Sequence, residues 1–403
     1  MTAHAAAGHL ADHYYLDARI FTDPQIFAEE LDKLFGRAWL FLGHECEAKE
    51  PSSYFCFEIG GTPVVICRHD DGRLRGFIDA CRECDGTVVS GRWGKGPLLR
   101  CSAGHAAYDL KGQAVEGDRK DGLEPIEIET LFGLVYGSLA PHESLRAFLG
   151  PALISWWEPR LRTDVEWELI HVFSFPTAVN WKAFMQPGDG YHVQGLHRIF
   201  AKYALPKGGF YKMQSLFSPA YGHTVFAYPP LDYERFRHSV WGNVTGPEEA
   251  EVPTLAHIPE GCGGYVGQTF PNMFYSIRNG WVFAANAVVP RAPERLVMDR
   301  RAYCRAGLTA EQKQIIQREE DIWSYPMGLN GQDDLANFEW QQKALRANTL
   351  PRLVVARYPG ENLDDIDTTV RSDSEAGYRA YFRRWRKYMD AGPEQSVRGM
   401  TAA

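Results

Sequence analysis

Two histidines with a nearby carboxylate could bind a metal ion. His192 and His197 stand five residues apart, with Asp189 just upstream and Tyr191 beside the first histidine. Two neutral imidazoles and one carboxylate on one face of Fe(II) leave open positions for oxygen and substrate. Residues i and i+5 lie about 140° apart on an ideal α-helix. Both rings can therefore reach one ion only if the helix breaks or bulges, and Gly195 favours such a break. Without further support, two histidines at this spacing are more often ordinary polar residues than metal ligands.

A second group of metal-binding residue types lies about a hundred residues earlier. Cys81-Arg82-Glu83 and Cys101-Ser102-Ala103-Gly104 are separated by the 17 residues from Cys84 to Arg100. Thiolates bind zinc and iron–sulfur clusters. Cys84 and His105 extend the pattern to Cys81-x2-Cys84 and Cys101-x3-His105. This is the spacing of a site with three cysteines and one histidine.

Together the two groups resemble the Rieske-type non-haem iron ring-hydroxylating oxygenases, in their large (alpha) subunit. In that family the cysteine pattern reads Cys-x-His, roughly 15 to 17 residues, then Cys-x-x-His. The resemblance covers roughly residues 15–390. Short segments similar to those of the family also occur at Asn180-Trp181-Lys182, at Arg68-His69-Asp70-Asp71-Gly72 and at Tyr108-Asp109-Leu110-Lys111-Gly112.

The resemblance implies that His192 and His197 hold a mononuclear Fe(2+) ion. It places the third ligand at Asp333, within Gly331-Gln332-Asp333-Asp334-Leu335, where benzoate- and anthranilate-type members carry Pro-Asp-Asp-Leu. Asp334, one residue away, is the alternative ligand. Asp189 matches the bridging aspartate of the family, which orients the first iron histidine and relays electrons between neighbouring subunits. We therefore expect Asp189, His192, His197 and Asp333 to be the catalytic residues.

The iron–sulfur pattern is incomplete. Glu83 and Gly104 stand where the family has histidines. A Rieske [2Fe-2S] cluster needs two thiolates on one iron and two imidazoles on the other, so a standard cluster is not expected here. Two interpretations remain open. Either the site is vestigial and Cys81 and Cys101 are buried small apolar residues, or Cys81, Cys84, Cys101 and His105 form a rebuilt site for zinc or a differently ligated cluster.

The implied activity is O₂ activation at Fe(II), with hydroxylation or dihydroxylation of a small aromatic substrate. Since the chain's own cluster site is incomplete, we expect its electrons to come from a complete Rieske oxygenase large subunit. The two would share a trimer or hexamer supplied by a reductase or ferredoxin. The alternatives are a non-catalytic assembly or regulatory homologue, and an iron oxygenase that an external reductase supplies directly.

Length and composition limit the class of protein. The 403 residues suffice for two or three domains, and 45% are hydrophobic. The net charge of −8, with both signs mixed along the chain, argues against nucleic-acid and membrane partners. No apolar run reaches the roughly 18 residues of a membrane span. The start resembles no signal peptide, so we expect a cytoplasmic protein whose eight cysteines are thiols or metal ligands.

The order of the predicted elements indicates an α+β fold. Short strands broken by glycine turns are expected at 54–59, 63–68, 74–79 and 131–138, and longer ones at 165–174, 265–269, 281–289 and 296–304. Helices are expected from Pro24, from the capping residue Thr309 with Gln312 to about Tyr325, from near Asp333 through Leu345, and over 374–389.

These elements, with the resemblance, predict four regions. Residues 1–40 form an N-terminal helical segment that packs on the catalytic domain. Residues 41–145 form a small all-β Rieske-like module with a rubredoxin- or zinc-ribbon-like subdomain at the cysteine loops. Residues 146–390 form a catalytic iron domain with an antiparallel sheet surrounded by helices, of the helix-grip or START-like type. Residues 391–403 form a flexible tail.

Overall fold

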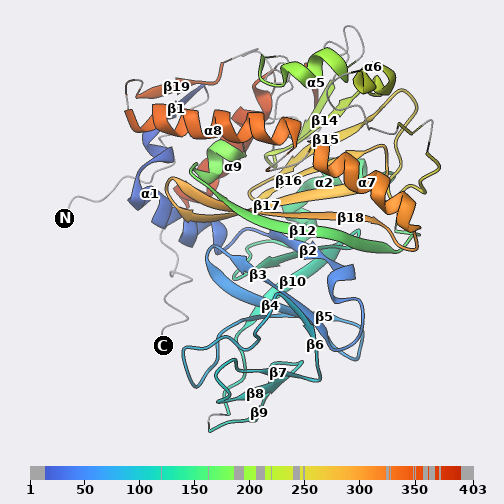
Figure 1. The fold of residues 1–403 in the computed structure, drawn as a ribbon. Helices are drawn as coiled ribbons and strands as arrows, with labels where there is room; N and C mark the ends of the chain where they lie inside the picture. Colours follow the sequence, from blue (N-terminus) through green and yellow to red (C-terminus); the bar gives the residue numbers. More distant parts are fainter. Residues whose placement is uncertain are drawn as a thin grey trace. The chain divides into compact units, whose positions relative to one another are not determined.

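The fold is described from a computed structural model (Figure 1). It describes residues 14–118, 120–161, 163–185, 195–205, 214–218, 220–238, 246–247, 250–323, 328–347, 351–356, 368–371 and 374–391, with the single residues 326, 349 and 362. Two compact units are present. Among the described residues, one unit contains 14–28 and 149–391, and the other contains Glu29–Phe148.

The smaller unit is built on antiparallel β-structure. Its seven-stranded sheet has the order β2 (Leu40–His44), β11 (Leu134–Ser138), β10 (Pro125–Leu131), β5 (Leu74–Ile78), β4 (Thr62–Arg68), β3 (Ser53–Ile59) and β6 (Trp93–Lys95). A separate three-stranded sheet contains β7 (Leu98–Arg100), β8 (Ala107–Asp109) and β9 (Ala114–Glu116). The helical turn η3 (Glu30–Phe35) precedes β2, and η4 (Glu45–Ala48) lies between β2 and β3. The all-β module predicted around the cysteines is therefore present.

The larger unit contains an eight-stranded antiparallel sheet. Its order is β12 (Trp167–Thr177), β18 (Arg295–Arg305), β17 (Val282–Ala292), β16 (Met273–Arg278), β15 (Gly264–Thr269), β14 (His223–Tyr228), β13 (Gln214–Ser218) and β20 (Thr368–Arg371). The central strand β17 is buried from Val282 to Pro290 because both faces of the sheet are covered. This is the predicted antiparallel sheet with surrounding helices.

Helices of the larger unit cover the sheet on both sides. They are η2 (Ala18–Phe21), α1 (Pro24–Glu29), α2 (Leu145–Trp157), α3 (Trp181–Phe184), α5 (Arg198–Tyr203), α6 (Tyr233–Arg237), α7 (Ala310–Trp323), α8 (Leu329–Ala347) and α9 (Ala376–Asp390). Helices α7 and α8 lie on the same side of the sheet (Figure 1). On the opposite face, Trp157 of α2 donates its indole N–H to the Tyr275 hydroxyl at 2.9 Å. Aromatic packing thus forms the core under β16 and β17.

The start of the chain is tied to the larger unit by strand pairing. Strand β1 (Tyr15–Asp17) is antiparallel to β19 (Arg352–Val354), which follows α8.

Helix α2 is kinked at Gly150, which has φ of +76° and is followed by proline. In the described part of the chain, no helix has the length and apolar character needed to cross a membrane.

Candidate active site

The centre of the candidate site is His197, on the turn before α5. Its backbone angles, φ −86° and ψ 60°, are not helical, and only 4% of the side chain is exposed. The Nε2 atom lies 3.1 Å from Asp334 Oδ1, and the Nδ1 atom lies 3.5 Å from Asp333 Oδ2. The imidazole is thus held between two carboxylates that are distant from it in sequence.

Both carboxylates belong to α8. The helix begins at Leu329, so the prediction that it begins near Asp333 was wrong by one helical turn. The Gln332 N–H already donates to the Gly328 carbonyl at 3.0 Å, so helical hydrogen bonding precedes the aspartates. Successive helical residues diverge by about 100°. This divergence explains how Asp333 and Asp334 reach opposite nitrogens of one ring.

A buried amide fixes α8 against the segment that leads to the histidines. Asn180 caps α3, its side-chain oxygen accepting the Lys182 N–H at 2.9 Å. Its side-chain N–H groups donate to the Phe21 carbonyl at 3.2 Å and the Pro293 carbonyl at 2.5 Å. Its own backbone N–H donates to Gln342 Oε1 on α8 at 2.9 Å. Asn180 therefore connects several elements around the site through its side chain and its backbone.

Asp189, Tyr191 and His192 lie outside the described residues, which omit 186–194. Their assigned roles stay predictions. The described part of the site supplies an imidazole and two carboxylates. Imidazole nitrogen and carboxylate oxygen are the donor types of a two-histidine, one-carboxylate Fe(II) site. One histidine and one carboxylate of that donor set therefore lie in contact in the described part of the chain.

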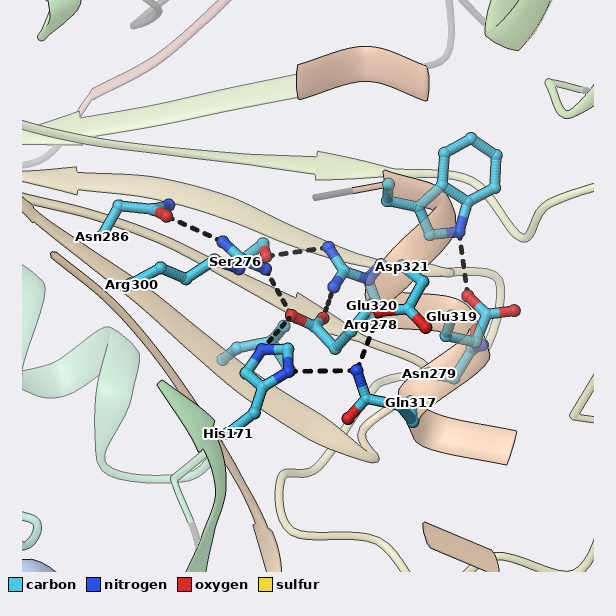
Figure 2. A network of polar contacts seen from close by, with 12 residues as sticks. His171, Ser276, Arg278, Asn279, Asn286, Arg300, Gln317, Glu319, Glu320 and Asp321 are labelled. Carbon is cyan, nitrogen blue, oxygen red and sulfur yellow. Dashed lines mark hydrogen bonds and ion pairs between the residues drawn. The ribbon is translucent and has the colours of Figure 1, made fainter. Parts of the chain in front are cut away.

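Polar residues that sequence reasoning missed form a buried network between the sheet and α7 (Figure 2). Glu320 of α7 is fully buried and forms ion pairs with Arg278 of β16 and Arg300 of β18. Arg300 also donates to Asn286 Oδ1 at 2.8 Å. The sequence offers only a weak signal for this network, charged residues inside otherwise apolar strands.

Two neighbouring groups have displaced pKa values. Burial raises the pKa of Glu319 to about 7. The positive charge of Arg278 and the hydrogen bond from Trp323 Nε1 act in the opposite direction and lower it. Burial and then the charge of Arg300 lower the pKa of His171 to about 4. Trp323 in turn packs edge-on against Phe200, with ring centroids 5.2 Å apart. Helix α7 thereby supports α5 directly after His197.

The structure also brings three predicted ligands of the smaller unit together. The Sγ atoms of Cys81, Cys84 and Cys101 all lie within 4.8 Å of one another. Cys81 and Cys101 belong to a buried hydrophobic cluster, as the vestigial interpretation expects. His105 is exposed and is not a member of this close group.

Glu83 and Gly104 stand at the positions where the resemblance expects the cluster histidines. Glu83 directs Oε1 toward Gly117, where an added Cβ would lie only 2.1 Å away. Gly104 has φ of +80° and no side chain to offer. At Cys81, Glu83, Cys101 and Gly104 the side chains thus supply two thiols and no imidazole.

The pKa values of Cys101 and Cys84 are displaced in opposite directions. Burial opposes ionisation of Cys101, but N–H groups of the His105 and Ala103 backbone and the neighbouring thiols stabilise its thiolate and lower its pKa to about 6. The Gly86 N–H favours the Cys84 thiolate, but proximity to Cys101 and Cys81 raises the pKa of Cys84 to about 11. The Cys84 and Cys101 sulfurs lie 3.4 Å apart.

Two protein-family models match the chain. The model "Ring hydroxylating alpha subunit (catalytic domain)" matches residues 162–391. The chain belongs to the ring-hydroxylating oxygenase alpha subunits. The model "Rieske [2Fe-2S] domain" matches residues 38–127. The chain is thus a homologue of the Rieske non-haem iron oxygenases, which are oxidoreductases that use O₂.

Individual relatives agree with the family. The chain is 24% identical to the methanesulfonate monooxygenase hydroxylase alpha subunit of Methylosulfonomonas methylovora, over 94% of this chain and 92% of the relative. It is 25% identical to the 2-aminobenzenesulfonate 2,3-dioxygenase alpha subunit of Alcaligenes sp., over 96% of each. Naphthalene 1,2-dioxygenase from Rhodococcus sp., solved with indole, shares the fold with a TM-score of 0.78 at 20% identity, over 94% of this chain and 95% of the other.

Proposed function

We propose that this chain is the O₂-activating subunit of a mixed oxygenase, with iron held by His192, His197 and Asp334. The observation that carries the proposal is the 3.1 Å separation of His197 Nε2 and Asp334 Oδ1. Two adjacent donors that each bind a metal at about 2.1 Å lie about 3 Å apart. This geometry favours Asp334 over Asp333 as the ligand.

Asp333 then has the orienting role. Its Oδ2 atom lies 3.5 Å from the other ring nitrogen of His197. A carboxylate on the second nitrogen of a metal-bound histidine fixes the ring and raises its basicity. Bound Fe(II) supplies O₂ activation. The chain's own residues hold the ion, orient His197 and, through α7 and α8, keep the ring buried.

The electrons come from another subunit in this proposal. The incomplete set at Cys81, Glu83, Cys101 and Gly104 lacks the imidazoles of a Rieske cluster. A complete large subunit, reduced by a reductase or ferredoxin, would donate from its own cluster to this chain's iron through Asp189. The assembly would be a mixed trimer or hexamer.

The proposed substrate is a small aromatic compound. Aromatic compounds with an anionic substituent are the first to be tested. The two relatives that span almost the full length are named for a methanesulfonate and an aminobenzenesulfonate substrate. A relative from Pseudomonas aeruginosa, 31% identical over 66% of this chain, is the large component of a naphthalene dioxygenase. Benzenesulfonates and benzoates therefore form the first panel, with naphthalene for comparison.

A reconstitution experiment tests the proposal. The chain is purified alone and with a complete large subunit, and iron, acid-labile sulfide and substrate oxidation are measured. We expect about one iron per chain, no sulfide, and NADH-driven turnover only with the partner. NADH-driven turnover by the cluster-free chain and a reductase would remove the need for a partner. An iron-free chain that still assembles with the partner would instead support the non-catalytic role.

The variant Glu83→His/Gly104→His gives a matched control. A Cβ added at Gly104 would meet nothing within 4 Å, although the φ of +80° strains any side chain at this position. If the missing histidines are the reason for partner dependence, the double variant should gain the Rieske absorption and electron paramagnetic resonance signals. Wild-type protein with those same signals would contradict the proposal.

A further inference from the structure

The three cysteines of the smaller unit are arranged around a point where a single ion would fit. All three sulfurs lie within 4.8 Å of one another, and the Cys84–Cys101 pair is 3.4 Å apart. Four sulfurs at about 2.3 Å from a tetrahedral zinc ion are separated by about 3.8 Å. The 3.4 Å pair and the 4.8 Å limit are compatible with that value. A third thiolate beside Cys81 and Cys101 exceeds the two thiolates of a Rieske cluster and suits one tetrahedral ion.

Backbone donors point at the same sulfurs. The Glu83 N–H donates to Cys81 Sγ at 3.5 Å, and the Gly86 N–H donates to Cys84 Sγ at 3.4 Å. In each case the donor lies two residues after the cysteine. Such N–H groups stabilise negative charge on sulfur, which is the form that binds a metal.

The loops that carry the cysteines are themselves fixed. Buried Asp79 accepts the N–H groups of Val88 and Val89 at 2.7 and 3.3 Å. The Tyr108 hydroxyl accepts the Arg82 N–H at 3.0 Å. A Cβ added at Gly86 would lie 3.3 Å from Cys84 Sγ and 3.4 Å from Cys101 Sγ, so a larger residue there would crowd the thiols. The sulfur positions are therefore held in advance of any ion.

We propose that Cys81, Cys84 and Cys101 bind one zinc ion in place of the Rieske cluster, with His105 as the fourth ligand. The spacing Cys81-x2-Cys84 and Cys101-x3-His105 suits a closed tetrahedral site. His105 is exposed on the loop that carries Cys101, and the proposal requires its ring to turn toward the sulfurs. The ion is redox-inactive and joins the Cys81–Gly86 loop to the β7–β8 hairpin. This site goes beyond the proposed oxygenase function and does not depend on it.

Metal analysis and cobalt exchange test this site. Wild-type chain purified under reducing conditions should contain about one zinc in addition to iron, and no sulfide. Its apo form titrated with Co(II) should give a thiolate-to-cobalt charge-transfer band that saturates at one equivalent. Cys84→Ser should weaken zinc retention against a competing chelator by at least about 10-fold. His105→Ala should change the tetrahedral d–d bands, and Cys262→Ser, a thiol outside the cluster, should change neither.

Three results would overturn the zinc site. They are two irons with two sulfides in the smaller unit, a metal-free chain with a Cys84–Cys101 disulfide after reducing purification, and a Co(II) titration without a thiolate band. The titration uses wild-type protein, so it decides the matter even if Cys84→Ser fails to fold. Iron bound at His197 is measured separately, so loss of the zinc site and loss of the iron site are distinguishable.

Discussion

His197 and Asp334 are in direct contact, although 136 positions separate them: Nε2 and Oδ1 lie 3.1 Å apart. The neighbouring aspartate contacts the opposite ring nitrogen at 3.5 Å. The two acids are therefore not equivalent, and their side chains differ in exposure, 13% for Asp334 against 39% for Asp333.

The two aspartates should respond differently to removal of their charge. We expect Asp334→Asn to lose iron and substrate oxidation because a metal ligand is gone. Asp333→Asn should keep iron, with affinity reduced about 10- to 100-fold because the ring loses its orienting carboxylate. Iron content after dialysis and turnover with the partner subunit measure both effects. The reverse pattern would make Asp333 the ligand.

Glu320 should be the most sensitive charged residue between the sheet and α7. Glu320→Gln leaves the buried guanidinium groups of Arg278 and Arg300 without their shared carboxylate. We expect the free energy of unfolding to fall by about 3–5 kcal/mol. Urea unfolding followed by circular dichroism measures the loss.

A partly exposed ion pair provides the matched control for Glu320. Glu168 contacts Lys313 at 2.6 Å, with both side chains more than a third exposed. Glu168→Gln should change stability by less than about 1 kcal/mol. Equal losses of unfolding free energy in Glu320→Gln and Glu168→Gln would show that burial does not determine how much the Glu320 contacts contribute to stability.

Glu319 should make stability depend on pH. Its pKa is raised from 4.5 to about 7 by burial, so the folded protein holds a proton that the unfolded chain releases. Its contribution is complete below pH 4.5 and is lost as pH rises through 7. Glu319→Gln should therefore remove a decline in stability over this window, measured by urea unfolding at several pH values. Glu311→Gln, an exposed change on the same helix, should keep the decline.

Asn180 should be intolerant of a negative charge. Its side-chain N–H groups face the carbonyls of Phe21 and Pro293, so Asn180→Asp would place a buried carboxylate against two oxygens. We expect a loss of about 3 kcal/mol or more, with loss of iron. Asn180→Ala, which only removes hydrogen bonds, should lose about 1–3 kcal/mol. An aspartate variant with the wild-type urea midpoint would contradict this role.

Features that depend on local sequence were predicted well. The reciprocal cap of α7 is present, with the Thr309 N–H on Gln312 Oε1 at 3.0 Å and the Gln312 N–H on Thr309 Oγ1 at 3.2 Å. The predicted strand at 296–304 corresponds to β18. Capping and alternation act over a few residues, so one sequence suffices to find them.

Features that depend on tertiary contacts were not predictable in the same way. Glu320 meets Arg278 and Arg300 only because α7 packs on strands β16 and β18. The start of α8 was expected near Asp333, whereas helical hydrogen bonding begins at Gly328. The choice between Asp333 and Asp334 depends on which side of a helix faces His197, and spacing alone does not determine it.

The amide of Asn180 has a consequence for the beginning of the chain. The Phe21 carbonyl accepts hydrogen bonds from the side-chain N–H groups of Asn180 and of Gln342 of α8, the latter at 3.3 Å. The turn η2 (Ala18–Phe21) therefore connects the segment that leads to the histidines with the helix that carries Asp333 and Asp334. Deletion of this turn should loosen the proposed iron site although every proposed ligand stays in the sequence.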